Sequence, residues 1–369
     1  MRLALLYHQF IARGGLEGYL LEFAGQLQAA GHELVLVTSR IDEPIRTLAA
    51  GVRLIPPALT SRGTLARFAK QSAALVPQLE VDAVLGFGRT WRQDLHRAGG
   101  GCHWHYSRML PWWKRLKPKN QLELGLEKKL YTGGGTRHFV VNSAKVKQEL
   151  AEAYQVPGER VSVIHTAVDT QKWRPAATPG IRQDLRKKLG IPNDAPALLF
   201  ASLDHRRKGL GTLLAALAQI PETRLWVAGQ SLEAWQREIQ RLGLSSRVTG
   251  IGRVDLLPWY QTADWFVHPT YYDACANTVL QSMACGLPGL ISVADGASEF
   301  IREGANGLTI GNPEDSDALA AQLRVALSQP EAARQQLCSV ARQTVLPLTW
   351  AAHLGQWVKV IRDTAAAPG

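Results

Sequence analysis

The sequence predicts an α/β protein built from two doubly wound domains, each a parallel sheet covered by helices. The chain has 369 residues, and at about 150 residues per domain this length implies two domains. Short apolar runs alternate with helix-periodic segments through both halves, which is typical of parallel sheets with helices on their faces. Between the halves, Asp169–Pro196 holds four prolines and little strand signal, so the domain boundary is expected there or just before.

The first half begins with an apolar run at Arg2–Tyr7, which predicts a strand. Leu16–Ala30 follows as a helix, with one apolar face, and Gly31 ends it. Glu33–Thr38 returns as the next strand, so the pair is expected to be parallel. Further strands are predicted at Val52–Ile55, Ala83–Gly86, His138–Asn142 and Val161–Ile164.

The second half repeats this alternation. Strands are predicted at 197–201, 224–228, 248–250, 265–268 and 289–292, and helices at 211–219, 232–242, 256–263, 277–284 and 315–327. We therefore expect an N-terminal domain over residues 1–168 and a C-terminal domain over 169–345. Residues 346–369 hold a last helix at Trp350–Asp363 with no strand after it, which is expected to return to the first domain.

The composition excludes several classes of protein. With 46% hydrophobic and 20% charged residues, disorder is excluded as the dominant state. Four scattered cysteines without a CxxC pair indicate neither a disulfide framework nor a structural zinc site. No apolar run is long enough to span a membrane, and Leu3–Leu6 is too short for a signal peptide, so a cytoplasmic protein is expected. The net charge of +11 implies an anionic partner: nucleic acid, a membrane surface or a phosphorylated substrate.

Two clusters at strand-to-helix junctions favour phosphate binding. Gly14 and Gly15 precede the first helix, where backbone N–H groups and the helix dipole attract anions, although Gly-Gly can also be only a tight turn. Neither a GxGxxG nor a P-loop motif is present. In the second half, Arg206, Arg207 and Lys208 directly follow a predicted strand, and three cations at a sheet edge suit a diphosphate. The alternative for this charge run is a solvated face.

Two further clusters suit a sugar and an acceptor. A loop and helix start over His268–Pro288 can offer backbone N–H groups at Ala276, Asn277 and Thr278. Asp273 and Gln281, eight residues apart, can both hold hydroxyls. In the first half, Gly99–Gly101 precede His103 and His105, and titratable imidazoles beside flexible backbone suit an acceptor site. The alternative for both histidines is a structural role.

The segment His103–Gln121 is both basic and aromatic. Trp112, Trp113, Lys114 and Arg115 lie at its centre, and no acidic residue occurs before Glu123. Tryptophan prefers the headgroup level of a bilayer, and each cation near an anionic leaflet contributes at most about 1 kcal/mol. The segment therefore predicts reversible membrane association, with a partly packed loop as the alternative. Single-stranded nucleic acid also binds such stretches, but the predicted α/β architecture does not favour it.

Taken in order, these clusters resemble the family 4 glycosyltransferases, retaining enzymes of the GT-B fold that use nucleotide sugars. The resemblance covers nearly the whole chain. It rests on Gly14–Glu17, on Val163–Asp169 at the domain junction, on Arg207–Gly209 and on the segment that begins at His268. Within the family the chain is most similar to the lipopolysaccharide-core glucosyltransferase branch, through Leu85–Phe87 and Ser202–Gly209.

The resemblance implies a role for each cluster. Gly14 and Gly15 would face the donor diphosphate, and Arg207 and Lys208 would neutralise it as it leaves. Asp273 and Gln281 stand where the family has the two glutamates of its Glu-x7-Glu motif, which hold the donor sugar and the ribose. Glu299 is a weaker candidate for the same site. His103 would lie near the acceptor, with His105 behind it.

The resemblance also implies the reaction and its partners. The donor would be a nucleotide-diphosphate sugar, with UDP expected, and the acceptor a lipid-linked saccharide at the inner face of a bacterial cytoplasmic membrane. No cofactor or metal is expected, since Asp315-Ser316-Asp317 begins a predicted helix, where acids are favoured as caps. Asp-x7-Gln departs from the family motif. A neutral amide in place of a carboxylate would weaken ribose binding by about 1 kcal/mol. The alternatives are another GT-B chemistry, such as an epimerase or phosphorylase, and a degenerate membrane- or glycan-binding module.

Overall fold

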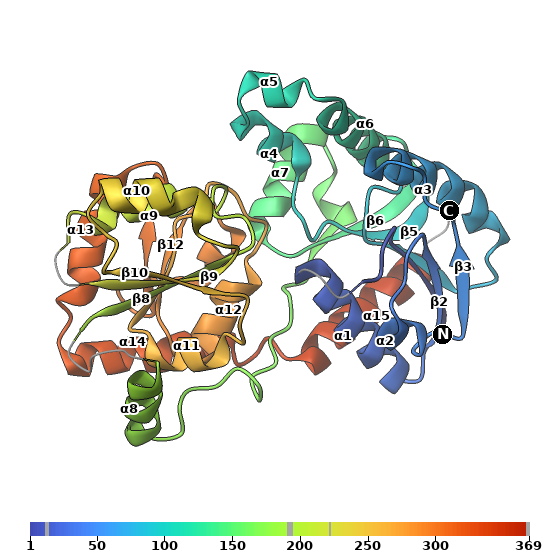
Figure 1. Ribbon diagram of the computed structural model, residues 1–369. Helices are drawn as coiled ribbons and strands as arrows, with labels where there is room; N and C mark the ends of the chain where they lie inside the picture. Colours follow the sequence, from blue (N-terminus) through green and yellow to red (C-terminus); the bar gives the residue numbers. More distant parts are fainter. Residues whose placement is uncertain (12–14, 190–194, 221–222, 367–369) are drawn as a thin grey trace. The chain divides into compact units, whose positions relative to one another are not determined.

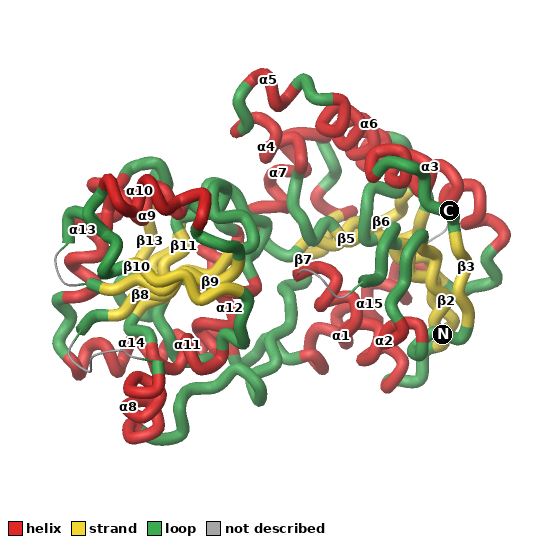
Figure 2. The backbone as a smooth tube through the Cα atoms, in the orientation of Figure 1, coloured by secondary structure: helices red, strands yellow, loops and turns green. Residues whose placement is uncertain are grey.

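The computed structural model describes residues 1–11, 15–189, 195–220 and 223–366. The chain divides into two compact units. The first is Met1–Thr166 with Trp350–Gly369, and the second is Ala167–Thr349. Each unit is a parallel sheet between two layers of helices (Figures 1 and 2), so the predicted pair of doubly wound α/β domains is confirmed. The division falls two residues before the expected end of the first domain and four residues after the expected end of the second.

The sheet of the first unit has seven strands in the order β3-β2-β1-β4-β5-β6-β7. Its strands are β1 (Arg2–Leu6), β2 (Glu33–Thr38), β3 (Gly51–Leu54), β4 (Ala83–Gly86), β5 (Gln93–Arg97), β6 (Thr136–Val141) and β7 (Val161–Val163). Its helices are α1 (Gly15–Ala29), α2 (Glu43–Arg46), α3 (Ser61–Leu75), α4 (His103–Met109), α5 (Trp112–Arg115), α6 (Pro118–Thr132), α7 (Ala144–Tyr154) and α15 (Trp350–Ala366), with 3-10 turns at Val76–Gln78 and Gly158–Arg160.

The C-terminal helix α15 belongs to the first unit. Trp357 is fully buried and packs its ring 5.2 Å from that of Phe23 on α1. His353 connects two further elements, because its Nε2 lies 2.8 Å from the Tyr19 hydroxyl and its Nδ1 lies 2.7 Å from the His165 carbonyl. Helices α1, α2 and α15 cover one face of the sheet. Helices α3, α6 and α7 cover the other, and α4 and α5 pack against α6 (Figure 1).

The sheet of the second unit has six strands in the order β10-β9-β8-β11-β12-β13. The strands are β8 (Ala197–Ser202), β9 (Arg224–Gly229), β10 (Val248–Gly252), β11 (Trp265–His268), β12 (Gly289–Ser292) and β13 (Gly307–Ile310). The helices are α8 (Pro179–Lys188), α9 (Leu210–Leu217), α10 (Gln236–Arg241), α11 (Leu257–Thr262), α12 (Asn277–Ala284), α13 (Ser316–Leu327) and α14 (Glu331–Val345), with 3-10 turns at Glu233–Trp235 and Gly296–Phe300.

Strand β8 shows why this unit needs continuous apolar runs. Leu198 and Phe200 pack into the core under α9, α10 and α13, whereas Leu199 and Ala201 pack on the opposite face against α11, α12 and α14. A central parallel strand is buried on both faces, so apolar residues occupy successive positions rather than alternate ones. Burial of these apolar residues on both faces stabilises the sheet. Because the strands are parallel neighbours, the carboxyl ends of β8, β11 and β12 lie at one edge.

Several elements were not expected from the sequence. The polar strand β5 was not predicted, and β13, α14 and the helices α4 to α6 also went unpredicted. Helix α8 lies in the proline-rich segment where, or just before which, the domain boundary was expected. Among the described residues, no helix is both long and apolar enough to cross a membrane.

Candidate functional site

Three loops of the second unit meet at the carboxyl edge of its sheet. They follow β8, β11 and β12, which are neighbours in the sheet. Backbone hydrogen bonds join them: the Tyr271 N–H donates to the Arg207 carbonyl (2.9 Å), and Asp273 pairs with the loop after β12 through Ala294 (3.2 Å) and Gly296 (3.1 Å). In parallel sheets this edge is the usual place for ligands. The loops therefore form one candidate site.

Lys208 lies at the centre of this site. Its ammonium contacts the Asp273 carboxylate and lies 3.3 Å from Nε2 of His268. The same His268 nitrogen lies 3.4 Å from Oδ2 of Asp295, and the side chains of His268 and Asp295 are fully buried. Gly209 permits this packing, since it has a φ of 79° and a Cβ there would collide with the Pro269 carbonyl. We call Lys208, His268, Asp273 and Asp295 the lysine cluster.

Burial and neighbouring charges shift the pKa values of two groups in the lysine cluster. Burial, followed by the charge of Arg207, lowers the pKa of Lys208 to about 7, while Asp295 and Asp204 act in the opposite direction. Burial and the charges of Lys208 and Arg207 hold the pKa of His268 well below its usual range. The imidazole is therefore neutral, and the lysine changes charge near neutral pH.

Arg207 is held beside the lysine cluster. Its Nε donates to Asp204 (3.2 Å), one terminal nitrogen donates to the Tyr272 carbonyl (2.8 Å), and the same nitrogen lies 3.8 Å from Asp273. Arg206, by contrast, is exposed. The structure thus brings two of the three consecutive cations to Asp273, and the third faces solvent.

The other predicted donor residues lie at the start of α12. Asn277 and Gln281 are one turn apart and both half-buried, whereas Val279 and Leu280 between them are buried, so the two amides share the uncovered face. The Ala276 N–H donates to Oδ1 of Asp295 (3.0 Å), so Ala276 offers its backbone N–H to this carboxylate. Thr278, next to Asn277 in the first turn, is half-buried. Glu299 is exposed in the turn Gly296–Phe300.

Two groups of side chains have the chemistry of metal ligands. His268, Asp273 and Asp295 offer one nitrogen and two oxygens within 4.8 Å of one another. The ammonium of Lys208 contacts one of these oxygens and lies 3.3 Å from the nitrogen, so a cationic side chain already stands among them. Asp315 has a different role: it caps α13 by accepting from the backbone N–H groups of Asp317 (3.0 Å) and Ala318 (2.8 Å).

At the first unit's sheet edge, Gly14 lies outside the described residues. Gly15 is the first residue of α1 and is exposed. Glu17, two residues into the helix, accepts hydrogen bonds from the Tyr7 hydroxyl (3.3 Å) and the Gln9 side chain (3.2 Å). These bonds tie the loop after β1 to the first turn of α1.

His103 connects two helices of the first unit. Its Nε2 lies 2.8 Å from Oδ1 of Asn120 and 3.3 Å from the Glu123 carboxylate, both on α6. Burial, followed by the charge of Arg89, lowers the pKa of His103. His105 lies 3.5 Å from Glu152 on α7. The structure therefore gives both histidines contacts between helices, and the predicted role of His103 at the acceptor stays a prediction.

Glu127 is a buried charge that the sequence did not reveal. Its carboxylate accepts from the backbone N–H groups of His103 (2.7 Å) and Trp104 (2.8 Å) at the start of α4, and from the Tyr154 hydroxyl (2.7 Å). Arg89 pairs with it at 3.0 Å, and the Glu127 side chain is fully buried. One carboxylate thus joins α4, α6, α7 and the loop after β4.

The basic and aromatic segment forms α4, α5 and the start of α6, at the end of the helical layer (Figure 1). Trp112 is 69% exposed and Trp113 is 55% exposed, and Met109 and Leu116 beside them are also exposed. Lys114 and Arg115 are exposed between these apolar side chains. Large exposed apolar groups that gather in one place mark an interaction surface. We call residues 108–119 the tryptophan surface.

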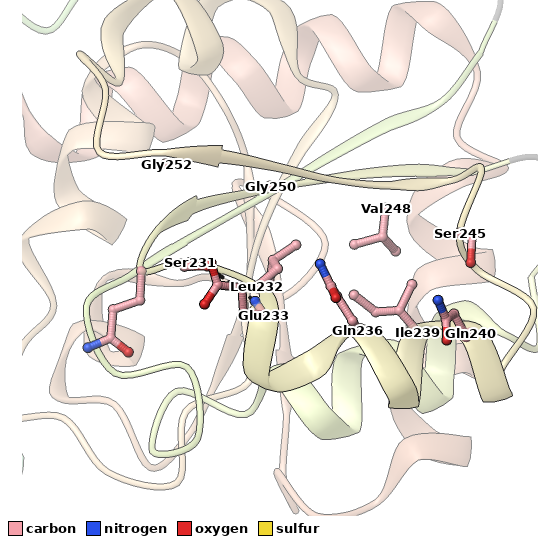
Figure 3. A pocket seen from close by; sticks show the side chains of 11 residues that line it. Ser231, Leu232, Glu233, Gln236, Ile239, Gln240, Ser245, Val248, Gly250 and Gly252 are labelled. Carbon is pink, nitrogen blue, oxygen red and sulfur yellow. Dashed lines mark hydrogen bonds between the residues drawn. The ribbon is translucent and has the colours of Figure 1, made fainter.

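A cavity of about 670 Å³ lies between α10, β10 and the loop after β9 (Figure 3). Leu232, Ile239 and Val248 give it an apolar part, and the side chains of Gln236 and Gln240 point from α10 toward β10. Its Gln230 end is joined to the loop of the lysine cluster, because His205 lies 3.0 Å from the Gln230 carbonyl. The sequence analysis did not indicate this cavity.

Known proteins match both units. A family model described as Glycosyltransferase Family 4 matches residues 13–172, and one described as Glycosyl transferases group 1 matches residues 195–329. Glycosyltransferase models thus match both units, and these matches confirm the resemblance to the family 4 glycosyltransferases found in the sequence.

The family 4 relatives include a lipopolysaccharide enzyme. The lipopolysaccharide glucosyltransferase WaaG of Escherichia coli K12 is 24% identical over 340 residues, which cover 89% of this chain and 90% of that protein. A D-inositol 3-phosphate glycosyltransferase of Mycolicibacterium paratuberculosis is 30% identical over 199 residues, which cover 50% of this chain and 44% of that protein.

Solved structures confirm the GT-B fold. A crystal structure of WaaG, a glycosyltransferase involved in lipopolysaccharide biosynthesis, superposes with a TM-score of 0.84 at 22% identity, over 99% of this chain and 100% of that one. Anabaena HepE in complex with UDP-glucose gives a TM-score of 0.78 at 18% identity, over 98% of this chain and 100% of that one.

Proposed function

We propose that this glycosyltransferase moves a sugar from a UDP-sugar to a lipid-linked saccharide, with retention at the anomeric carbon. The observation that carries the proposal is the contact of the buried Lys208 ammonium with Asp273 at the carboxyl edge of the sheet. A cation that can bind a diphosphate stands beside a carboxylate that can bind sugar hydroxyls. The names of two neighbours support the substrate classes, namely the lipopolysaccharide glucosyltransferase WaaG and HepE with UDP-glucose.

In the proposed mechanism the donor diphosphate takes the place of Asp273 beside Lys208. Arg207 and Lys208 bind its oxygens, and Asp273 turns to hydroxyls of the donor sugar. Gln281, on the uncovered face of α12, holds the ribose through its amide. The base is placed at the Gln230 end of the cavity between α10 and β10, where amides can meet its polar edge.

The chemical step needs charge stabilisation and no strong protein base. The bond between the anomeric carbon and the diphosphate oxygen breaks, and the acceptor hydroxyl forms its bond on the same face. Its proton passes to an oxygen of the leaving diphosphate, whose growing negative charge Arg207 and Lys208 stabilise. Two protein cations supply this stabilisation, so we propose a reaction that does not require a metal ion.

A donor panel tests the proposed function. The protein is incubated with UDP-, GDP- and ADP-sugars and with a bacterial glycolipid extract, and release of nucleotide diphosphate is measured. We expect UDP release that depends on the acceptor extract. Absence of release with every donor would contradict the transferase proposal and favour a glycan-binding module.

We also propose that the protein acts at the inner face of the cytoplasmic membrane, held by the tryptophan surface. Replacing Trp112, Trp113, Lys114 and Arg115 with alanine should lower binding to anionic liposomes at least about tenfold, since it removes two interfacial rings and two charges. Cosedimentation with vesicles containing phosphatidylglycerol measures this.

The matched control removes two exposed cations from the second unit, Lys187 and Lys188 on α8. This double alanine variant lowers the net charge by the same amount and leaves the tryptophans in place. Equal loss of binding in both variants would mean that overall charge, and not the tryptophan surface, attracts the membrane.

A further inference from the structure

Asp295 is a fully buried carboxylate that the proposed mechanism has not used. It follows β12, and its Oδ1 accepts from the backbone N–H groups of Ala276 (3.0 Å) and Ala297 (2.8 Å). Two bonds to backbone groups on different loops fix its position and favour its charged form. Its second oxygen, Oδ2, faces Nε2 of His268 at 3.4 Å.

The surroundings of His268 define which ring nitrogen carries the hydrogen. The ring stacks on Phe266 (centroids 5.7 Å apart), and its Nδ1 is buried with no hydrogen-bond partner among the described residues. Nε2 lies 3.3 Å from the Lys208 ammonium, which can only donate, so this ring nitrogen accepts from Lys208 and carries no hydrogen. Oδ2 of Asp295 lies 3.4 Å from the same nitrogen, so His268 and Asp295 stand together beside Lys208.

Lys208 is faced by charged or titratable groups from three loops and from the end of β11. These groups are Asp204, Arg207, His268, Asp273, Cys275 and Asp295. Arg207 disfavours the charged form of Lys208, and burial disfavours it further. In the proposed mechanism Asp273 leaves Lys208 when the donor sugar binds, so Asp273 cannot be the lasting counter-charge. Asp295 stays in place because backbone groups hold it.

We propose that Asp295 and His268 are a positioning pair: Asp295 is the permanent counter-charge of Lys208, and His268 accepts a hydrogen bond from the Lys208 ammonium and aims it. This inference rests on the proposed function, because it assigns the second layer of the same diphosphate site. The pair keeps the ammonium charged and aimed at the diphosphate after Asp273 has turned to the sugar.

The experiment measures the dissociation constant of UDP by calorimetry between pH 5.5 and 9, for the wild type and three variants. Lys208 binds the diphosphate in its charged form, so affinity is high below its pKa and falls as the pH rises through it. Asp295→Asn keeps the acceptor for both N–H groups and removes the charge. Its affinity should fall at a pH about one to two units lower than in the wild type.

His268→Phe separates the two roles. It keeps the ring packed on Phe266 and the charge of Asp295, so the pH midpoint should move less than in Asp295→Asn. Affinity below the midpoint should fall about threefold to tenfold, because the Lys208 ammonium loses the acceptor that aims it. A third variant, Asp295→Glu, keeps the carboxylate charge that Asp295→Asn removes. Its pH midpoint is therefore expected near the wild-type value.

An unchanged midpoint in Asp295→Asn would overturn the counter-charge. If that variant does not fold, an unchanged affinity in His268→Phe would overturn the pair by itself. A wild type that binds none of UDP, GDP and ADP would instead contradict the proposed function, so the two failures are distinguishable.

Discussion

Replacing Lys208 with methionine is expected to lower kcat/KM for the sugar donor about a thousandfold, since loss of one preorganised donor to a developing charge costs about that much. Methionine keeps most of the buried stem and removes the ammonium. Without the ammonium, the leaving diphosphate loses one of its two cations. In the free enzyme, Asp273 loses its contact with Lys208. The effect is measured from initial rates of nucleotide release at varied donor concentration, with the acceptor saturating.

Arg206 provides the matched control for this prediction. It lies two residues earlier in the same loop, and its side chain is exposed. Arg206→Ala should therefore keep activity within about threefold of the wild type, which corresponds to well under 1 kcal/mol. Thermal unfolding of both variants shows whether they fold. Comparable activity in folded Lys208→Met and Arg206→Ala would contradict the diphosphate site.

Glu127→Ala is expected to lower the free energy of unfolding by about 3–5 kcal/mol, which is typical when one partner of a buried ion pair is removed. The change leaves the half-buried Arg89 without its 3.0 Å partner. It also removes the acceptor for the first N–H groups of α4 and for the Tyr154 hydroxyl. Urea unfolding followed by tryptophan fluorescence measures the loss.

Glu123 is the control for Glu127, because it lies one turn earlier on α6 with its side chain 20% exposed. It faces His103 (3.3 Å) and Lys119 (3.8 Å), so Glu123→Ala should cost less than about 1 kcal/mol. An equal and small loss for both variants would mean that Glu127 does not hold the helices α4, α6 and α7 together.

Much of the fold could be predicted from apolar periodicity. The runs at β1, β2, β8 and β9 predicted strands within one or two residues, because central parallel strands are buried on both faces. Strand β5 was missed because its sequence is polar: the side-chain nitrogen of the buried Gln93 donates to Thr136 (2.9 Å) on β6, a partner 43 residues away. Local sequence cannot reveal such a long-range partner.

The donor side of the site was predictable for a topological reason. Arg207 and Lys208 follow β8, and Asp273 follows the adjacent strand β11, so the strand order alone brings their loops to one edge of the sheet. Asp295 went unnoticed because it lies in a short loop of ordinary residues, and its importance depends on burial and on the N–H groups of Ala276 and Ala297. The bridging contacts of His103 to α6 also depend on helices that the periodicity did not predict.

The central claim is that Lys208 and Asp273 separate to receive the donor, and a crystal structure with a bound UDP-sugar tests it most directly. The predicted result places Nζ of Lys208 within about 3 Å of a diphosphate oxygen, the distance of a charge-assisted hydrogen bond. Asp273 is then at a hydroxyl of the sugar, and Asp295 is unmoved beside His268. A diphosphate bound elsewhere, with the contact between Lys208 and Asp273 intact, would contradict the account.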